Sequence, residues 1–164
     1  MAEISAFLGS ALTTIDPKGR MAIPAIFRNP IITSSSGESS VVFSYNAQAQ
    51  CLQGYGTERL SALLAQMRRR EELANESGEE FRTEIVGGPR FNATATISFD
   101  GSGRLILPKM LVAMAKIEKH VFFSGNGTDF SVWGVEHLLT LDDPRLASHQ
   151  FNARFLMEEL GGKR

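Results

Sequence analysis

The sequence has 164 residues, of which 43% are hydrophobic, and a formal net charge of −1 at pH 7. This length suits one ordinary domain or two small ones with a buried core. The apolar runs are far shorter than the ~20 residues that cross a bilayer, which excludes a membrane-spanning protein. The single cysteine, Cys51, excludes an internal disulfide and agrees with a reducing compartment.

The N-terminus and the net charge set two further expectations. Residues 1–5 include an acid, Glu3, where a signal peptide carries positive charge, and no long apolar stretch follows. We therefore expect a cytoplasmic protein. The slightly negative charge argues mildly against nucleic-acid binding, because phosphate binding depends on Lys and Arg that displace counterions. A nucleic-acid binder of this composition must gather its positive charge on one face.

An internal repeat is the strongest feature of the sequence. Residues 7–24 align without gaps with residues 91–108, an offset of 84, with identical Asp, Gly, Arg and Pro residues at matching positions. The similarity resumes downstream at a slightly smaller offset. Each unit is roughly 60 residues, near the lower limit for independent folding, so we expect the two halves to share a core with each other or with neighbouring chains.

Each copy begins with a β-branched run that leads into an Asp-x-x-Gly-Arg turn, which predicts a strand and a tight hairpin. The aspartate can accept hydrogen bonds from backbone N–H groups two residues on, and the glycine supplies a positive φ. A short apolar strand follows, and a proline then marks the start of a helix. The turn-shaping residues are Asp16 and Gly19 in the first copy and Asp100 and Gly103 in the second.

Further strands are predicted at residues 40–45, 51–54, 120–124 and 129–133. A helix begins near Thr57, with Leu60, Leu63, Leu64 and Met67 as its apolar stripe. Ser77 and Glu80 have the spacing of a capping box, which predicts a short helix that Gly87-Gly88-Pro89 ends. Asp143 and Pro144 open a C-terminal helix, whose apolar residues could be buried against another element or could serve assembly or an additional partner. Those residues are Phe151, Phe155 and Leu160.

The sequence contains no convincing set of catalytic or metal-binding residues, so we expect no enzyme, metal or cofactor. His120, His137 and His149 lack ligand spacing, and no second cysteine could join Cys51 at zinc. Cys51 itself falls in a predicted strand, where a buried inert thiol is more common than a nucleophile. Asp16 and Asp100 could form a catalytic carboxylate pair, but a repeated turn aspartate explains both more simply.

Basic residues at the turns predict a DNA-binding surface. A two-stranded β-ribbon fits the major groove, where Arg can bind a guanine edge and Lys can reach phosphate. An ion pair within each turn, from the arginine to the aspartate, is the alternative role, and the two roles can coexist. The candidate DNA-binding residues are Lys18, Arg20, Arg28, Arg104 and Lys109. The triplet Arg68-Arg69-Arg70 is followed by acids and is interpreted as a solvated helix face.

The duplicated Asp-x-x-Gly-Arg turn, the apolar triplet and proline after it, and the helical connectors resemble the MraZ family of bacterial transcriptional regulators, whose units are similar to those of AbrB and SpoVT. The match covers about Phe7 to Leu141. The resemblance implies a mainly β, α+β fold of two tandem swapped-hairpin β-barrel units. It divides the chain into a first unit (7–56), a helical connector (57–90), a second unit (91–141) and a C-terminal helix and tail (142–164).

The resemblance also implies a function. Several chains would form a homo-oligomeric ring that binds short direct repeats in double-stranded promoter DNA and acts as a repressor of the division and cell-wall gene cluster, in the cytoplasm and associated with the nucleoid. The second turn has Ser102 where the first has Lys18, so we expect the first turn to dominate DNA contact. The alternative is an oligomeric interaction module of the same fold that does not bind DNA specifically.

Overall fold

The structure, a computed structural model, describes residues 6–162. The interpretation of residues 1–5 as unlike a signal peptide lies outside the described residues. In the part that is described, no helix combines the length and the apolarity needed to cross a bilayer. The chain combines helices with antiparallel strands, which confirms the mixed α+β class.

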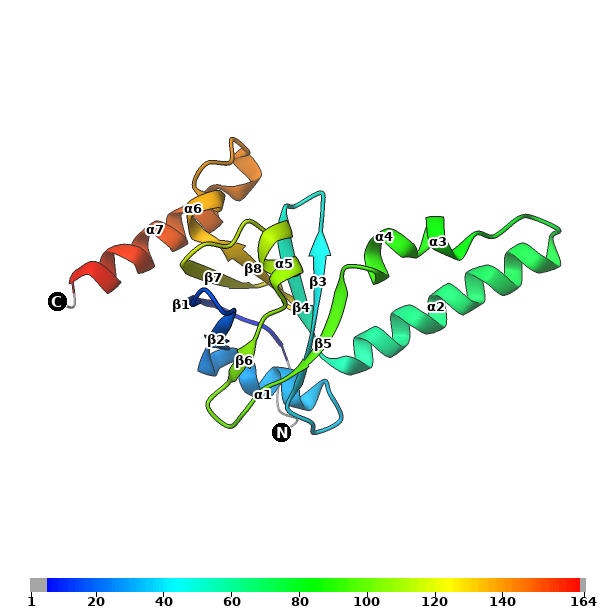
Figure 1. The fold of residues 1–164 in the computed structure, drawn as a ribbon, viewed down its shortest axis with the longest axis horizontal. Helices are drawn as coiled ribbons and strands as arrows, with labels where there is room; N and C mark the ends of the chain where they lie inside the picture. The colour runs from blue at the N-terminus through cyan, green and yellow to red at the C-terminus, as the bar shows by residue number, and fades with distance from the viewer. Residues whose placement is uncertain (1–5, 163–164) are drawn as a thin grey trace.

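The two halves repeat the same order of strands, with different helices after them (Figure 1). The first half contains β1 (Ser10–Thr14), β2 (Arg20–Ala22), α1 (Ala25–Thr33), β3 (Ser40–Asn46), β4 (Cys51–Tyr55), α2 (Thr57–Glu76), α3 (Thr83–Val86) and α4 (Gly88–Phe91). The second half contains β5 (Thr94–Ser98), β6 (Arg104–Ile106), α5 (Lys109–Met114), β7 (His120–Gly125), β8 (Phe130–Gly134), α6 (Val135–Leu138), the 3-10 helix η1 (Pro144–Leu146) and α7 (Ala147–Gly162). Pro24 and Pro108 are the N-cap residues of α1 and α5, as predicted.

The strands of the two halves are interleaved in one six-stranded sheet with the order β1-β7-β8-β4-β3-β5. β1 of the first half pairs with β7, and β5 of the second half pairs with β3. The registers are equivalent, since Ser10 lies opposite Ser124 and Thr94 lies opposite Ser44. The hairpin predicted across each turn is therefore wrong in its pairing, because the strand before each turn finds its partner in the other half.

A second, two-stranded sheet joins the halves again. β2 pairs antiparallel with β6, with Met21 opposite Leu105 at the centre. We call this pair the β2–β6 ribbon. Side chains alternate between the two faces of a strand, and Met21 and Leu105 are buried while their neighbours point outward. The ribbon is thus attached to the core by its inner face and leaves its outer face free.

The main core is shared by both halves, as expected for units of this size. Its centre is a group of phenylalanines around Phe130, whose ring centroid lies 5.1 Å from that of Phe7 and 5.2 Å from that of Phe27. Phe43 and Phe123 contact the same ring from β3 and β7. All five side chains are buried, so the aromatic cluster fixes the interleaved arrangement from its centre.

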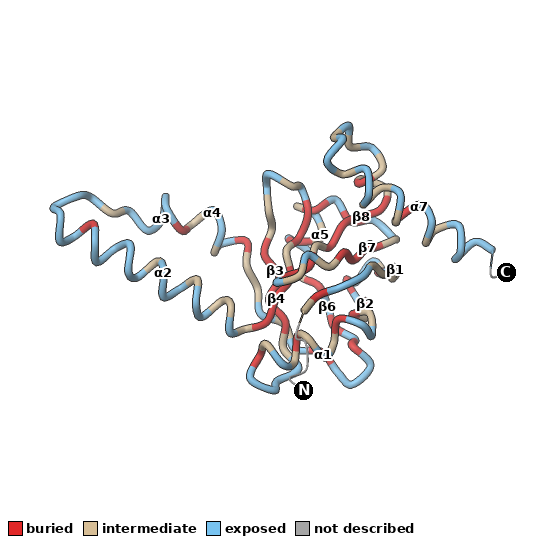
Figure 2. The backbone as a smooth tube through the Cα atoms, turned by 180° about the vertical axis from the view of Figure 1, so that it is seen from behind, coloured by how far each residue is buried: buried red, intermediate tan, exposed pale blue. Residues whose placement is uncertain are grey.

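The helix α2 projects from the sheet as an arm, with α3 and α4 returning along it (Figure 2). Of its residues only Ala74 is buried, and the Arg68-Arg69-Arg70 triplet is exposed as expected. The capping box predicted from Ser77 and Glu80 is wrong. Ser77 is the C-cap of α2, where its hydroxyl donates to the Leu73 carbonyl, and Gly78 then takes a φ of +73° that ends the helix. Gly87-Gly88-Pro89 ends α3 as predicted, but α4 begins at once because proline suits a first helical turn.

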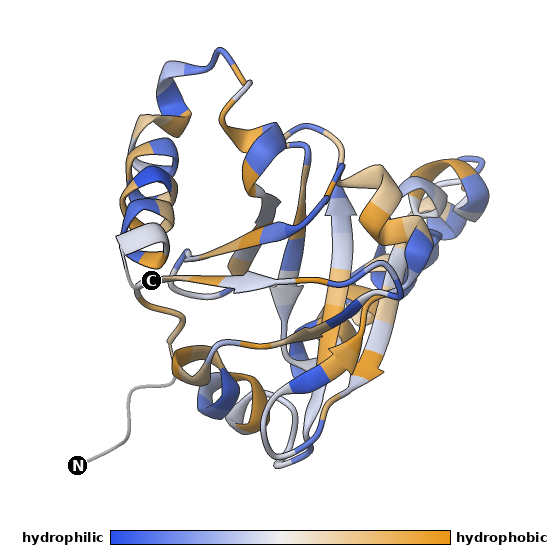
Figure 3. Ribbon diagram, turned by 60° about the vertical axis from the view of Figure 1, so that its left-hand side comes forward, coloured by the Kyte–Doolittle hydropathy of each residue, from blue (hydrophilic) through white to orange (hydrophobic). Residues whose placement is uncertain are grey.

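The helix α7 packs over the outer side of the sheet, where a second buried cluster contains Phe122, Trp133 and Ala153. Asp143 caps the preceding turn by accepting a hydrogen bond from the backbone N–H of Arg145, as the Asp-Pro pair predicted. Three apolar side chains of α7 are not buried against another element within the single chain, which leaves assembly or an additional partner as their expected role. They are exposed: Phe151 (66%), Phe155 (51%) and Leu160 (49%). Hydrophobic and hydrophilic segments alternate along this C-terminal helix (Figure 3).

Candidate nucleic-acid interface

The two Asp-x-x-Gly-Arg turns have the same internal geometry. In the first turn, Oδ1 of Asp16 accepts hydrogen bonds from the backbone N–H groups of Lys18 and Arg20, both at 2.9 Å. In the second turn, Oδ1 of Asp100 accepts from the corresponding N–H groups of Ser102 and Arg104, also at 2.9 Å. The repeated aspartates therefore shape the backbone of each turn, and they are not a catalytic pair.

Each turn is also held by a glycine that approaches the other half closely. Gly19 has a φ of +86°, and a Cβ atom there would lie 2.5 Å from the carbonyl oxygen of Leu107. Gly103 has a φ of +80°, and a Cβ atom there would lie 2.6 Å from the carbonyl oxygen of Ile23. The carbonyl of each glycine accepts a hydrogen bond of 2.8 Å from the N–H of the same opposing residue. Only glycine combines this φ with this approach.

The arginine of each turn is held by its aspartate through one nitrogen. Nε of Arg20 donates to Oδ2 of Asp16 at 2.5 Å, and Nε of Arg104 donates to Oδ2 of Asp100 at 2.8 Å. Hydrogen bonds from the backbone N–H groups of the arginines, followed by those from their side chains, lower the pKa of both aspartates. The carboxylates therefore stay ionised and orient the guanidinium groups.

The ion pair and the DNA-binding role are compatible in this geometry. The side chains of Arg20 and Arg104 are 62% and 74% exposed, and within residues 6–162 their terminal Nη atoms have no hydrogen-bond partner. Both arginines lie on the outer face of the β2–β6 ribbon, because the cross-strand partners are Arg20 with Ile106 and Ala22 with Arg104. The fold thus brings two oriented guanidinium groups from distant parts of the sequence onto one face.

The other basic candidates lie around the ribbon in unequal positions. Lys18 is exposed in the first turn, and Lys109 is exposed as the first residue of α5. Arg28 is half-buried, and its Nε donates to the carbonyl of Ile23 at 2.9 Å. Its side chain lies beside Gly103, so this arginine from the first half flanks the turn of the second half. The local sequence placed Arg28 near its own turn and could not show this.

Between residues 6 and 162, the other titratable side chains form no reaction centre. Burial raises the pKa of the Cys51 thiol to about 12, so Cys51 stays protonated, which agrees with the inert thiol expected there. Among the described residues, no group of three His, Cys, Asp or Glu side chains could hold a metal ion. Nδ1 of His120 pairs with Oε1 of Glu136 at 2.8 Å, and Nε2 of His137 lies 3.2 Å from Oε1 of Gln50.

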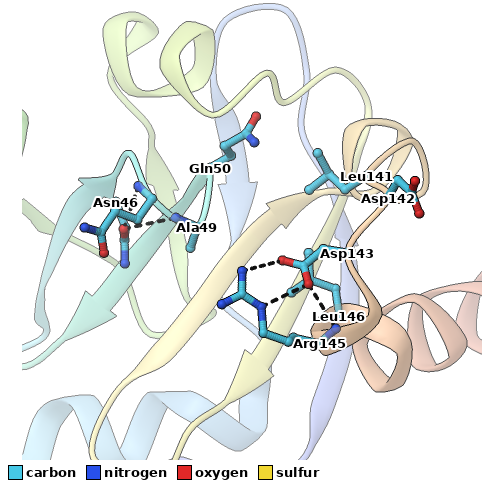
Figure 4. A pocket seen from close by; sticks show the side chains of 9 residues that line it. Asn46, Ala49, Gln50, Leu141, Asp142, Asp143, Arg145 and Leu146 are labelled. Carbon is cyan, nitrogen blue, oxygen red and sulfur yellow. Dashed lines mark hydrogen bonds and ion pairs between the residues drawn. The ribbon is translucent and has the colours of Figure 1, made fainter.

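A polar hollow lies between the β3–β4 turn and the segment before α7, and Asp143 and Arg145 on its wall pair with each other (Figure 4). The carboxylate of Asp143 accepts from Nε and Nη2 of Arg145 at 3.0 and 2.9 Å. Oδ1 of Asn46 accepts from the backbone N–H groups of Gln48 and Ala49 within the turn. These contacts shape two turns and provide neither a nucleophile nor a base.

Comparisons with known proteins agree with the duplicated turns. A family model described as "MraZ protein, putative antitoxin-like" matches residues 91–137. The chain is similar to the transcriptional regulator MraZ of Saccharophagus degradans, with 30% identity over 132 residues that cover 79% of this chain and 83% of that protein. The protein of the same name from Rickettsia bellii is 31% identical over 119 residues, 73% of this chain and 74% of its own.

A third relative, the transcriptional regulator MraZ of Gluconacetobacter diazotrophicus, is 28% identical over 131 residues, which are 79% of each chain. All three are named as transcriptional regulators and none as an enzyme, in agreement with the expectation that this chain is not an enzyme. The similarity includes the second Asp-x-x-Gly-Arg turn within the matched family model. On this identity and coverage, the chain belongs to the MraZ family.

Proposed function

We propose that this protein is a sequence-specific DNA-binding transcriptional regulator that presents the outer face of the β2–β6 ribbon to the major groove. The names of its relatives, which are transcriptional regulators, support the regulatory role. The observation that carries the DNA-binding mode is the position of Arg20 and Arg104 on one face, each oriented by an aspartate through Nε. The more specific targets are those implied by the resemblance: repression of the division and cell-wall cluster from direct repeats near the promoter.

The geometry of the ribbon suits base recognition. The major groove of B-DNA admits a two-stranded β-ribbon, and Arg binds the O6 and N7 atoms of guanine with two nitrogens. The Nη atoms of Arg20 and Arg104 are available for this contact, because the aspartates engage only Nε. An arginine that is already oriented loses less side-chain entropy on binding, which increases affinity. We expect Lys18, Arg28 and Lys109 to contact neighbouring phosphates.

The charge of a single chain is too small for tight DNA binding, which is why we include assembly in the proposal. The first turn carries one more positive than negative charge, and the second turn is neutral. A ring of identical chains repeats the ribbon and gives avidity across several DNA repeats. Binding to chromosomal DNA would hold the proposed assembly in the cytoplasm, on the nucleoid.

Exposed apolar side chains on opposite sides of the sheet support the homo-oligomer. The arm of α2 and α3 and the outer side of α7 extend in opposite directions from the sheet (Figure 1). Contact between different surfaces of neighbouring copies can close into a ring. The exposed apolar residues are Leu64, Leu73, Ile85 and Val86 on the arm and Phe151, Phe155 and Leu160 on α7.

A salt-series anisotropy titration on DNA from upstream of the gene, beside unrelated DNA of the same length, tests the proposal. We expect tight, salt-sensitive and sequence-selective binding by the wild-type protein, and loss of selective binding in Arg20→Ala. Arg69→Ala is the matched control, because it removes the same charge from the arm, where Arg69 pairs with Glu72. Equal affinity for both DNAs at low salt would favour the alternative, an interaction module without specific DNA binding. The observation that favours this alternative is the neutral charge of the second turn.

A further inference from the structure

The outer face of the β2–β6 ribbon carries a large apolar side chain beside the arginines. The six residues of the ribbon alternate, with Met21 and Leu105 turned inward. The outward residues are the two arginines, Ala22 and Ile106. Ile106 is 63% exposed, so a β-branched hydrophobic residue stands in water on the face that is proposed to meet DNA.

The repeat makes this side chain informative. Ile106 occupies the position in the second copy that Ala22 occupies in the first, so the two-fold similarity of the ribbon is broken there. Ile106 lies directly opposite Arg20, and Ala22 lies directly opposite Arg104. Cross-strand Cβ atoms are about 4.5–5.5 Å apart, so Ile106 flanks the aliphatic stem of Arg20. The smaller exposed fraction of Arg20, 62% against 74% for Arg104, agrees with this larger neighbour.

We infer that Ile106 contacts the C5 methyl group of a thymine next to the guanine bound by Arg20, an inference that rests on the proposed function. The thymine methyl is the apolar group that a base pair presents in the major groove. Strands in a sheet are about 4.7–4.9 Å apart, and base pairs rise by 3.4 Å, so residues opposite each other reach the same or neighbouring base pairs. The pair of Arg20 and Ile106 thus matches a guanine with an adjacent thymine.

The asymmetry also gives the ribbon a direction. A fully symmetric ribbon would bind a DNA site equally well in both orientations. The two orientations are unequal because Arg20 has Ile106 beside it, whereas Arg104 has only Ala22. The first turn also has Lys18 where the second has Ser102, which adds to the difference. A directional ribbon suits direct repeats, which every copy in a ring meets in one orientation.

The test removes only the methyl group from the DNA. Thymines in a duplex that the wild-type protein binds selectively are replaced by deoxyuridine, which keeps Watson–Crick pairing, and dissociation constants are measured by anisotropy. We expect the wild-type protein to lose about fourfold in affinity for each contacted thymine, the effect of one buried methyl group. Ile106→Ala should bind both duplexes with the affinity of the wild-type protein for the deoxyuridine duplex. Ile26→Ala, which shortens another exposed isoleucine, on α1 and 51% exposed, should behave as wild type.

The outcomes separate the inference from the proposed function. Wild-type protein that binds selectively but does not distinguish the two duplexes would overturn the role of Ile106 and leave the regulator standing. Ile106→Ala with equal losses on both duplexes and a changed assembly mass would show that Ile106 contacts a second copy instead. Absence of selective binding by the wild-type protein would overturn both. Since Ile106 is exposed, an unchanged thermal midpoint of the variant shows that it folds.

Discussion

The two halves of this chain share their strands and turns but differ in the helices that follow. After β4, the helix α2 continues for 20 residues as an exposed arm. After β8, the helix α6 ends at Leu138, and α7 returns to cover Phe122 and Trp133. The part that both halves keep is the part that builds the β2–β6 ribbon. The helices take no part in the strand pairing of the ribbon, so they are free to differ between the two halves.

Within the turns and the ribbon, the changes in charge and from a small to a large side chain lie on the outer surface. The inward pair, Met21 and Leu105, is apolar in both copies because both side chains pack into one core. The outward positions differ in charge, where Lys18 corresponds to Ser102, and in size, where Ala22 corresponds to Ile106. The buried positions of the ribbon therefore keep the apolar character common to both copies, and the exposed positions differ between them.

The largest expected effect tests whether the two turns are structurally equivalent. Gly19→Ala should lower the free energy of unfolding by about 3 kcal/mol, because a left-handed backbone and a clash with Leu107 act together. Gly103→Ala should lose a similar amount. Gly37→Ala, with a φ of +84° but open space around it, is the control and should lose about 1 kcal/mol. Urea unfolding measures all three, and a small loss in Gly103→Ala would break the equivalence.

The second prediction tests whether the turns are functionally unequal. Arg20→Ala should weaken selective DNA binding by at least tenfold, since a bidentate base contact contributes about 1–3 kcal/mol. Arg104→Ala should weaken it less, because its turn lacks a lysine and its neighbour is Ala22. Titrations with one promoter fragment compare the two variants. Losses of the same size would show that both turns contribute alike.

The third prediction concerns the free energy of unfolding at acidic pH. The lowered pKa values of Asp16 and Asp100 mean that the folded state binds protons less readily than the unfolded state. The stabilisation is therefore complete above the ordinary carboxyl pKa of about 4 and is lost as the pH falls through the lowered values. The double variant Asp16→Asn and Asp100→Asn should show a flatter dependence of unfolding free energy on pH below about 4. An unchanged slope would mean that other carboxylates dominate acid unfolding.

The smallest expected effect belongs to the second half alone. Burial lowers the pKa of His149, whose ring lies 5.8 Å from that of Trp133 beneath α7. Since the folded state disfavours the charged imidazole, the stability of this contact is complete above about pH 6.5 and decreases below it. Trp133 is the only tryptophan, so its emission should shift to longer wavelength on acidification. His149→Phe should remove the shift, and a shift that persists would assign it to another group.

The sequence predicted the strands and turns well because their signals are local and occur twice. β-Branched runs, a turn aspartate and a turn glycine each specify a few neighbouring residues. Which strands pair was not predictable locally, since β1 and β2 find their partners in the other half. Arg28 illustrates the consequence, because the interleaving carries it to the second turn.

Other features depended on context that a local pattern lacks. Ser77 and Glu80 have capping-box spacing, but Gly78 between them ends α2 first. Ala22 and Ile106 escaped notice as surface residues because an apolar residue in a short strand normally indicates burial. Alignment of the two copies with their period-two alternation was the signal that could have found them, since it places both on the face of the arginines.

The central claim is that the arginines of the β2–β6 ribbon bind guanine bases, and one substitution in the DNA tests it directly. Guanines of a selected promoter repeat are replaced by 7-deazaguanine, which lacks the N7 acceptor but pairs normally. We predict that the wild-type protein loses about tenfold in affinity, that Arg20→Ala, which keeps only the contact of Arg104, loses less, and that the double variant Arg20→Ala and Arg104→Ala shows little further loss on the modified DNA. Equal affinity of the wild-type protein for modified and unmodified DNA would contradict base recognition and would assign these arginines to the phosphates.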